Sequence, residues 1–275
     1  MTSFKMGQKQ IIELPADFGD KKTVLSVLHP EKESDILTVL FHGSYGCANF
    51  REGNKYAHLA RIFAGKGISS CLVETSRKRR DRHAYSEDRA AWIGAAFQGK
   101  TFVQELQEVC AALIEIARVY PQKRLWLIGF SLGGILAYLA LSDVIKDILA
   151  LEDKTLPGLI PHAEALILAG SGERSDSHSV ATLPILSSRP QLMMEPYVGK
   201  GVCPGRIIGF YGSDDDTFTE ESCRLLLQYC GLPEDRKFFH VLDGVDHRFR
   251  FRNGIPSGSI LREMVDLILA DSVEV

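Results

Sequence analysis

The sequence lacks the long apolar runs and the one-sided charge that mark several classes of protein. Its longest apolar runs, such as residues 125–128 and 165–169, fall far short of the ~20 residues that a membrane-spanning helix requires. Lysine and arginine number 32 against 35 acidic residues, a formal charge of −3, which supplies no basic field of the kind that binding to a phosphate backbone requires. The composition therefore argues against membrane insertion and against nucleic acid as a partner.

Paired cysteines are also missing. The six cysteines are spread along the chain without a C-x-x-C pair, and the first ten residues contain no apolar stretch resembling a secretory signal peptide. Free thiols are typical of a reducing compartment. We therefore expect a cytoplasmic protein without disulfide bonds.

A length of 275 residues corresponds to about 1.8 domains of ~150 residues, which is one large domain or two small ones. The motifs and strands described below extend from about residue 36 to residue 247 and leave no block large enough for an independent core. We therefore expect residues 1–275 to form a single domain. Residues 171–205, which contain four prolines and no clear periodicity, are expected to form a small cap or an excursion from the sheet.

Short apolar runs alternate with helical patterns along the chain. Continuous aliphatic and β-branched runs are typical of strands that are covered on both faces, as in a largely parallel sheet. Such runs occupy residues 36–41, 68–73, 124–130, 163–169, 206–211 and 237–242, and weaker ones at 10–14 and 23–28 predict an antiparallel edge pair. Apolar residues recur at helical spacing in residues 55–64, 102–119, 132–141, 220–230 and 260–270.

The alternation predicts an α/β fold. We expect a mostly parallel, twisted sheet of about eight strands with helices on both faces. A short insertion is expected between the sixth and seventh strands.

A G-x-S-x-G motif lies where the strand at 124–130 meets the helix at 132–141, with Ser131 between Gly129 and Gly133. A serine at such a sharp turn has a strained backbone, and side chains at the flanking positions would collide with the neighbouring strand and helix. The amides of the helix N-terminus favour a developing oxyanion beside the serine. Ser131 is therefore the candidate nucleophile, and the alternative is a plain glycine-rich turn. Phosphate binding is not predicted, because G-x-G-x-x-G and G-K-[ST] are both absent.

With this motif the sequence resembles the α/β-hydrolase superfamily of serine esterases, lipases and thioesterases, including enzymes like dienelactone hydrolase and the catalytic domains of prolyl oligopeptidases. The resemblance covers most of the chain from about residue 36 onward. It implies the α/β-hydrolase fold and a triad in which the acid and the histidine follow the serine. It implies no metal and no cofactor.

His247 is the expected base of that triad. It lies in G-V-D-H-R-F, just beyond the strand at 237–242, and this segment resembles the G-x-x-H-x-F loop of the family. In sequences of this family the acid falls three residues after a glycine, so the resemblance implies Asp215, three residues after Gly212 in the loop that follows the strand at 206–211. Three carboxylates remain as alternatives to it: Asp214, Asp216 and Glu173. Asp216 is alternatively interpreted as the N-cap of the following helix.

An oxyanion loop is expected after the strand at 36–41, where H-G-S-Y-G resembles the H-G-x-x-G loop of the family. Two backbone amides must point at the oxygen that becomes negative. We assign them to Ser44 and Leu132, with Tyr45 as the alternative to Ser44. His42 is interpreted as a structural member of this loop.

Two basic clusters are expected at the carboxyl edge of the sheet, where ligands bind in such folds. The first spans residues 77–82 and includes Arg79 and Arg80, and the second comprises Arg248, Arg250 and Arg252. Either cluster is a binding site for an anionic substrate or a solvated charged loop.

An apolar acyl pocket is the second feature that the sequence suggests near the site. Met194, in the segment 171–205, is a candidate lining residue because methionine adapts to varied ligands. The alternative is that it packs this segment onto the sheet.

These features together predict a serine hydrolase that cleaves a small-molecule carboxylic ester through an acyl-enzyme. An acyl-thioesterase or a peptidase with the same triad is the alternative within this chemistry. From other classes, a cofactor-independent lyase or peroxidase of the same fold and a non-catalytic binding protein stay open, because fold alone does not fix function.

Overall fold

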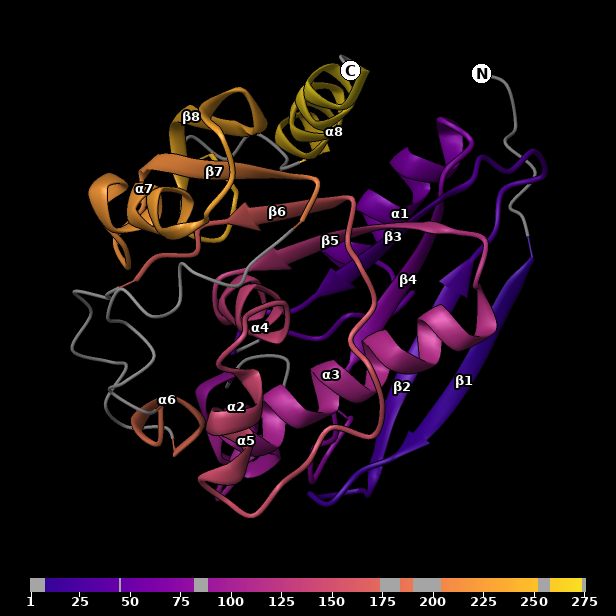
Figure 1. Ribbon diagram of the computed structural model, residues 1–275, viewed down its shortest axis with the longest axis vertical. Coiled ribbons are helices and arrows are strands. Elements are labelled where there is room, and N and C mark those ends of the chain that lie inside the picture. The colour runs from indigo at the N-terminus through magenta and orange to yellow at the C-terminus, as the bar shows by residue number, and fades with distance from the viewer. Residues whose placement is uncertain are drawn as a thin grey trace.

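The computed structural model in Figure 1 describes residues 8–44, 46–81, 89–173, 184–189, 204–251 and 258–273. One sheet of eight strands runs through it in the order β1-β2-β4-β3-β5-β6-β7-β8. The strands are β1 (Lys9–Pro15), β2 (Lys22–Leu28), β3 (Ile36–Phe41), β4 (Ser69–Glu74), β5 (Arg124–Phe130), β6 (Ala165–Ala169), β7 (Arg206–Asp214) and β8 (Lys237–Asp246).

Strand direction changes only at one side of this sheet. The pairs β1–β2 and β2–β4 are antiparallel, whereas β4, β3, β5, β6, β7 and β8 all pair in parallel. Both the mostly parallel sheet and the antiparallel pair at its edge are therefore confirmed. All parallel strands end at one edge, which gathers the loops that follow them.

Helices cover both faces of the sheet, as predicted, with α1 and α8 on one face and α3 and α4 on the other (Figure 1). The helices are α1 (Lys55–Gly65), α2 (Arg89–Phe97), α3 (Phe102–Val119), α4 (Leu132–Ala140), α5 (Ile145–Ala150), α6 (Pro184–Ser187), α7 (Glu220–Tyr229) and α8 (Gly258–Val273). Buried side chains of α2, α5 and α7 belong to the same core layer as those of α3 and α4.

The two core layers explain why the strands are continuous apolar runs. In β3, Leu37, Val39 and Phe41 pack into the layer beneath α3 and α4, whereas Leu40 packs into the layer beneath α1 and α8. Successive strand residues point to opposite faces, so a sheet covered twice favours apolar side chains at most positions of a strand.

Three helices had no counterpart in the sequence patterns. α5 and α6 are too short for a periodic stripe to be recognised. α2 is apolar in nearly all of R-A-A-W-I-G-A-A-F, so its sequence contains no contrast between a polar and an apolar face.

The insertion between the sixth and seventh strands, β6 and β7, contains α6. Residues 174–183 and 190–203, which include Met194, lie outside the described residues. The interpretation of 171–205 as a cap therefore stays a prediction. No helix in the described part of the chain combines the length and the apolar character needed to cross a membrane.

Three glycines let α4 approach the sheet closely. A Cβ atom added to Gly129 would lie 2.3 Å from the Cα of Gly134, and one added to Gly133 would lie 2.6 Å from the carbonyl oxygen of His42. A Cβ atom on Gly134 would lie 2.2 Å from the hydroxyl oxygen of Ser171. These distances are far below van der Waals contact, so larger residues would push the start of α4 away from β5.

Gly129→Ala is therefore expected to destabilise the protein, by about 1–3 kcal/mol or more, because overpacking forces the backbone to shift. Gly94→Ala is the matched control, since a Cβ atom there meets nothing within 4 Å and alanine in a helix is favoured by up to ~1 kcal/mol over glycine. Urea unfolding measures both free energies. Equal unfolding midpoints for the two variants would contradict the packing described here.

Candidate active site

Ser131 occupies a strained turn between β5 and α4. Its backbone has φ 52° and ψ −124°, a left-handed conformation that is uncommon for a residue with a side chain. Two hydrogen bonds hold it: the Ser131 amide donates to the carbonyl of Ala169 at 2.9 Å, and its carbonyl accepts from the Ser171 hydroxyl at 2.8 Å. The end of β6 and the residues just after it thus fix the conformation that presents the Ser131 hydroxyl at the end of the sheet.

The structure brings together the three side chains that the sequence predicted as a triad. The hydroxyl oxygen of Ser131 lies 3.1 Å from Nε2 of His247, and Nδ1 of His247 lies 2.9 Å from Oδ2 of Asp215. The Asp215 side chain is fully buried. Its second oxygen accepts hydrogen bonds from the amides of Thr217 and Phe218, at 2.8 and 3.0 Å, which fixes the direction of the carboxylate.

This arrangement sets the roles of the two imidazole nitrogens. Because the Asp215 carboxylate can only accept, Nδ1 of His247 carries the proton and Nε2 is left as the acceptor that faces Ser131. The geometry is therefore that of a hydroxyl hydrogen-bonded to a base whose orientation is held by a buried acid.

None of the alternative carboxylates bonds to His247. Asp214 is the last residue of β7, opposite Asp246 in the sheet register, and Asp216 accepts from the Thr217 hydroxyl. The backbone amide of Glu173 donates to the carbonyl of Ser222, and its side chain is buried.

The N-cap interpretation of Asp216 is wrong. α7 begins at Glu220, and its N-cap is Thr219, whose hydroxyl accepts from the amide of Ser222. The helix thus begins at the residue that the helical spacing predicted, and its N-cap lies three residues beyond Asp216.

His42 lies buried beneath the loop that follows β3. Its Nδ1 is 2.9 Å from the carbonyl oxygen of Gly43, and its Nε2 is 3.1 Å from both the Thr75 hydroxyl and a guanidinium nitrogen of Arg77. Since arginine can only donate, Nε2 is the acceptor and Nδ1 donates to Gly43. Burial, together with the charge of Arg77, lowers the pKa of His42 to about 3, so the ring is neutral and supports the loop.

Arg77 fixes the same loop from below and is fully buried. One guanidinium nitrogen donates to the carbonyl of Gly46 at 3.3 Å, contacts the sulfur of Cys47 at 3.2 Å and pairs with Glu74 at 3.4 Å. Although burial alone would raise the pKa of Glu74, Arg77 and Arg80 hold it below its ordinary value. Arg77 therefore links the end of β4 to the loop after β3.

Arg79 and Arg80 also have carboxylate partners. Arg80 pairs with Glu74 at 2.8 Å and with Asp20, and Arg79 pairs with Asp81 at 2.6 Å. Neither arginine is among the residues that line the pocket beside Ser131. In the described part of the chain, the basic cluster after β4 is thus structural or solvated, and the structure gives no support to its assignment to substrate binding.

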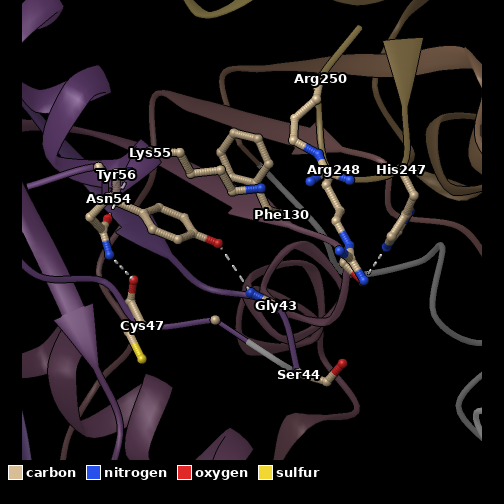
Figure 2. Close-up of a pocket in the computed structure, with 13 residues that line it drawn as sticks. Gly43, Ser44, Cys47, Asn54, Lys55, Tyr56, Phe130, His247, Arg248 and Arg250 are labelled. Atoms are coloured by element: carbon tan, nitrogen blue, oxygen red, sulfur yellow. Dashed lines mark hydrogen bonds between the residues drawn. The ribbon is translucent and has the colours of Figure 1, made fainter. Parts of the chain in front are cut away.

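The candidate oxyanion amides lie at two sides of the nucleophile. Leu132 is the first residue of α4, and Ser44 follows Gly43, whose added Cβ atom would lie 3.1 Å from the Cβ of Ser131. Within the described residues neither amide donates a hydrogen bond, whereas the amide of Gly43 donates to the Tyr56 hydroxyl at 3.3 Å (Figure 2). Tyr45 lies outside the described residues.

A pocket of about 310 Å³ opens beside Ser131 and His247. Its walls come from the loop after β3, the first residues of α1, the end of β5 and the loop after β8 (Figure 2). Arg248 and Arg250 line it, as the sequence suggested, and Arg252 lies outside the described residues.

The sequence did not predict that α1 contributes side chains to the pocket. Lys55 and Tyr56, the first two residues of that helix, line the pocket. A signal for them did exist, because the helix that follows a parallel strand begins at the ligand-binding edge of the sheet.

No protein-family model and no curated protein matches the sequence. Among solved structures, the chain is similar to esterase 2 of Thermogutta terrifontis phosphorylated by paraoxon, with a TM-score of 0.65 and 16% identity over 98% of this chain and 96% of that chain. The chain is also similar to a cold-adapted esterase from an Arctic intertidal metagenomic library, with a TM-score of 0.59 and 18% identity over 96% of this chain and 93% of that chain. A third similar structure is dienelactone hydrolase from Anabaena variabilis, with a TM-score of 0.56 and 11% identity over 96% of this chain and 98% of that chain. This chain therefore has the α/β-hydrolase fold, as predicted.

The neutral state of His42 has a consequence for stability at low pH. Below pH 6.5 the unfolded chain takes up a proton at His42 that the native protein, with a pKa of about 3 there, does not. The free energy of unfolding therefore falls as the pH falls from 6.5 toward 3, by up to about 1.4 kcal/mol per pH unit from this group. His42→Gln, which keeps an acceptor for Arg77, is expected to make this dependence shallower.

Urea unfolding between pH 7 and pH 4.5 compares the two proteins. The difference between wild type and variant isolates His42 from the other titrating groups. Parallel stability curves would contradict a neutral, buried His42.

Proposed function

We propose that the protein is a serine hydrolase that cleaves carboxylic esters through an acyl-enzyme intermediate. The observation that carries the proposal is the hydrogen-bonded series from Ser131 through His247 to the buried Asp215, at 3.1 and 2.9 Å. The similar structures include several esterases, which supports a hydrolase and favours esters as substrates.

In this mechanism the Ser131 hydroxyl oxygen attacks the acyl carbon while Nε2 of His247 removes its proton. Asp215 orients the ring and stabilises the imidazolium that forms. The amides of Ser44 and Leu132 donate to the oxygen that becomes negative, an interaction commonly worth a few kcal/mol for each donor. His247 then gives its proton to the leaving alcohol, and water hydrolyses the acyl-enzyme with the same histidine as base.

Acyl-thioesters and peptides remain the alternatives for the same machinery, because only the leaving group differs. A lyase or peroxidase reaction would use the same three residues on another substrate. A graded series of p-nitrophenyl esters, assayed beside acyl-thioesters of matching chain length, ranks these substrate classes by kcat/KM.

Ser131→Ala is expected to lower kcat for p-nitrophenyl esters by at least ~10⁴-fold, because the residual rate comes from binding and the oxyanion amides alone. It should also abolish covalent labelling by a fluorophosphonate probe. Ser187→Ala, at an exposed serine in α6, is the control and should label normally. Labelling that survives Ser131→Ala would refute the assignment of the nucleophile.

The three adjacent aspartates supply matched controls for the acid. Asp215→Asn is expected to lower kcat by ~10⁴-fold, because the amide favours the wrong tautomer of the histidine. Asp214→Asn and Asp216→Asn remove the same charge without touching His247 and should stay within a few-fold of wild type. A loss at either of these that equals the loss at Asp215 would show that net charge matters here, and not orientation of the imidazole.

A further inference from the structure

β1 is an open edge of the sheet, at the opposite end from β8 (Figure 1). It pairs with β2 on one side, and no other strand in the described part of the chain pairs with its outer side. Such an edge exposes a row of backbone amides and carbonyls to which a further strand can bond. Ile11 in this strand is 69% exposed. The edge therefore combines unpaired backbone groups with an exposed apolar side chain, and both favour the addition of a strand.

The pairing of β1 with β2 determines which backbone groups of β1 face outward. The pairing is antiparallel and continuous along the strand, and the carbonyl of Gln8, just before it, accepts from the amide of His29 at 3.0 Å. Residues of an antiparallel strand direct both of their backbone groups to one neighbour and to the other in alternation. Even-numbered residues of β1 therefore bond to β2, whereas Lys9, Ile11 and Glu13 direct their amides and carbonyls outward.

The side chains of these three residues share one face of the strand. Alternate side chains of a strand point in the same direction, so Lys9, Ile11 and Glu13 lie in a row, and all three are exposed. On the other face, Ile12 and Leu14 pack against the core. A cation, an aliphatic side chain and an anion thus follow one another along the outer edge.

This order of residues is complementary to itself when two copies meet with antiparallel strands. A two-fold axis at Ile11 places this residue opposite the same residue of the second copy, and it places Lys9 opposite Glu13 on both sides of the axis. Opposite charges and apolar pairs that face each other across strands are both stabilising. Because all three positions direct backbone groups outward, each opposed pair can also exchange hydrogen bonds in both directions.

Other antiparallel registers lack this match. Only odd-numbered residues direct backbone groups outward, so a shift that keeps the hydrogen bonds places Ile11 opposite either Lys9 or Glu13. A larger shift places Glu13 opposite itself or Lys9 opposite itself, and like charges in that position are destabilising. Pro15 has no amide hydrogen to donate to a second strand. The charges therefore favour the register centred on Ile11.

The partner that Glu13 already has in its own chain is compatible with this register. Lys22 of β2 contacts Oε1 of Glu13 at 2.7 Å, and both side chains are exposed. A carboxylate can accept through both of its oxygens, so Glu13 can bind a second cation from the other copy.

We propose that a second copy of this chain pairs with β1, antiparallel and about a two-fold axis at Ile11, so that the two sheets become one continuous sheet. β7 and β8, which precede Asp215 and His247, lie at the other end of the strand order. Pairing at β1 therefore leaves both candidate active sites outside the interface. The proposal does not depend on the proposed function.

Sedimentation velocity over a series of protein concentrations tests the dimer. Wild type is expected to show a dimer whose fraction rises with concentration. Lys9→Glu and Glu13→Lys should each weaken self-association about tenfold or more, because each variant opposes like charges twice across the axis. An equimolar mixture of the two variants should associate at least as tightly as wild type, since every opposed pair again combines a cation with an anion.

Lys146→Glu, at an exposed lysine of α5, is the matched control. It makes the same change in net charge as Lys9→Glu and should leave self-association unchanged. A wild type that stays monomeric at every concentration would overturn the proposal. So would a dimer that neither charge variant weakens, or two weakened variants that do not associate when they are mixed.

Ile11→Cys tests the register by disulfide formation. Cα atoms of a hydrogen-bonded antiparallel pair are ~5.5 Å apart, which is within the range that a disulfide spans. Oxidation of this variant should therefore give a covalent dimer that dithiothreitol reverses. Leu159→Cys, at a residue that is 90% exposed in the loop before β6, and wild type with its own cysteines are the controls. A yield of covalent dimer no higher than in these controls would contradict the register.

Discussion

The candidate site depends on one buried cation, the guanidinium of Arg77. On the proposed mechanism the loop after β3 points a backbone amide at one place beside Ser131, and no strand pairing holds the described residues of this loop. Arg77 donates to the carbonyl of Gly46 and to the ring of His42, and that ring in turn donates to Gly43. These contacts fix the carbonyl groups of Gly43 and Gly46, and with them the course of the loop.

A cation in that position requires carboxylates around it, because an unpaired buried charge costs several kcal/mol. Glu74 pairs with Arg77, and a second buried cation, Lys100, pairs with Glu105 and Glu108 on α3 at 2.5 and 3.0 Å. Buried ion pairs add little net stability compared with apolar packing, and their best-attested use is to fix one arrangement among several. The preorganised amides that oxyanion stabilisation needs are such an arrangement.

Most of the fold could be predicted because its signals are local: continuous apolar runs give strands, and G-x-S-x-G gives the turn at Ser131. The choice of Asp215 among three adjacent aspartates could not be predicted from residue types. It depends on direction, which the amides of Thr217 and Phe218 set. The basic run after β4 was ambiguous for a related reason. Its charges are visible in the sequence, but their carboxylate partners, such as Asp20, lie far away along the chain.

On the proposed mechanism, Asp215 offsets the positive charge that forms on His247 when Ser131 attacks. The Asp215 side chain is fully buried, and the amides of Thr217 and Phe218 fix the direction of its carboxylate. Because the remaining oxygen of that carboxylate can only accept, it holds the proton of the imidazole on Nδ1 of His247. The contacts that distinguish Asp215 from the adjacent aspartates therefore also leave Nε2 of His247 free to take the proton of Ser131.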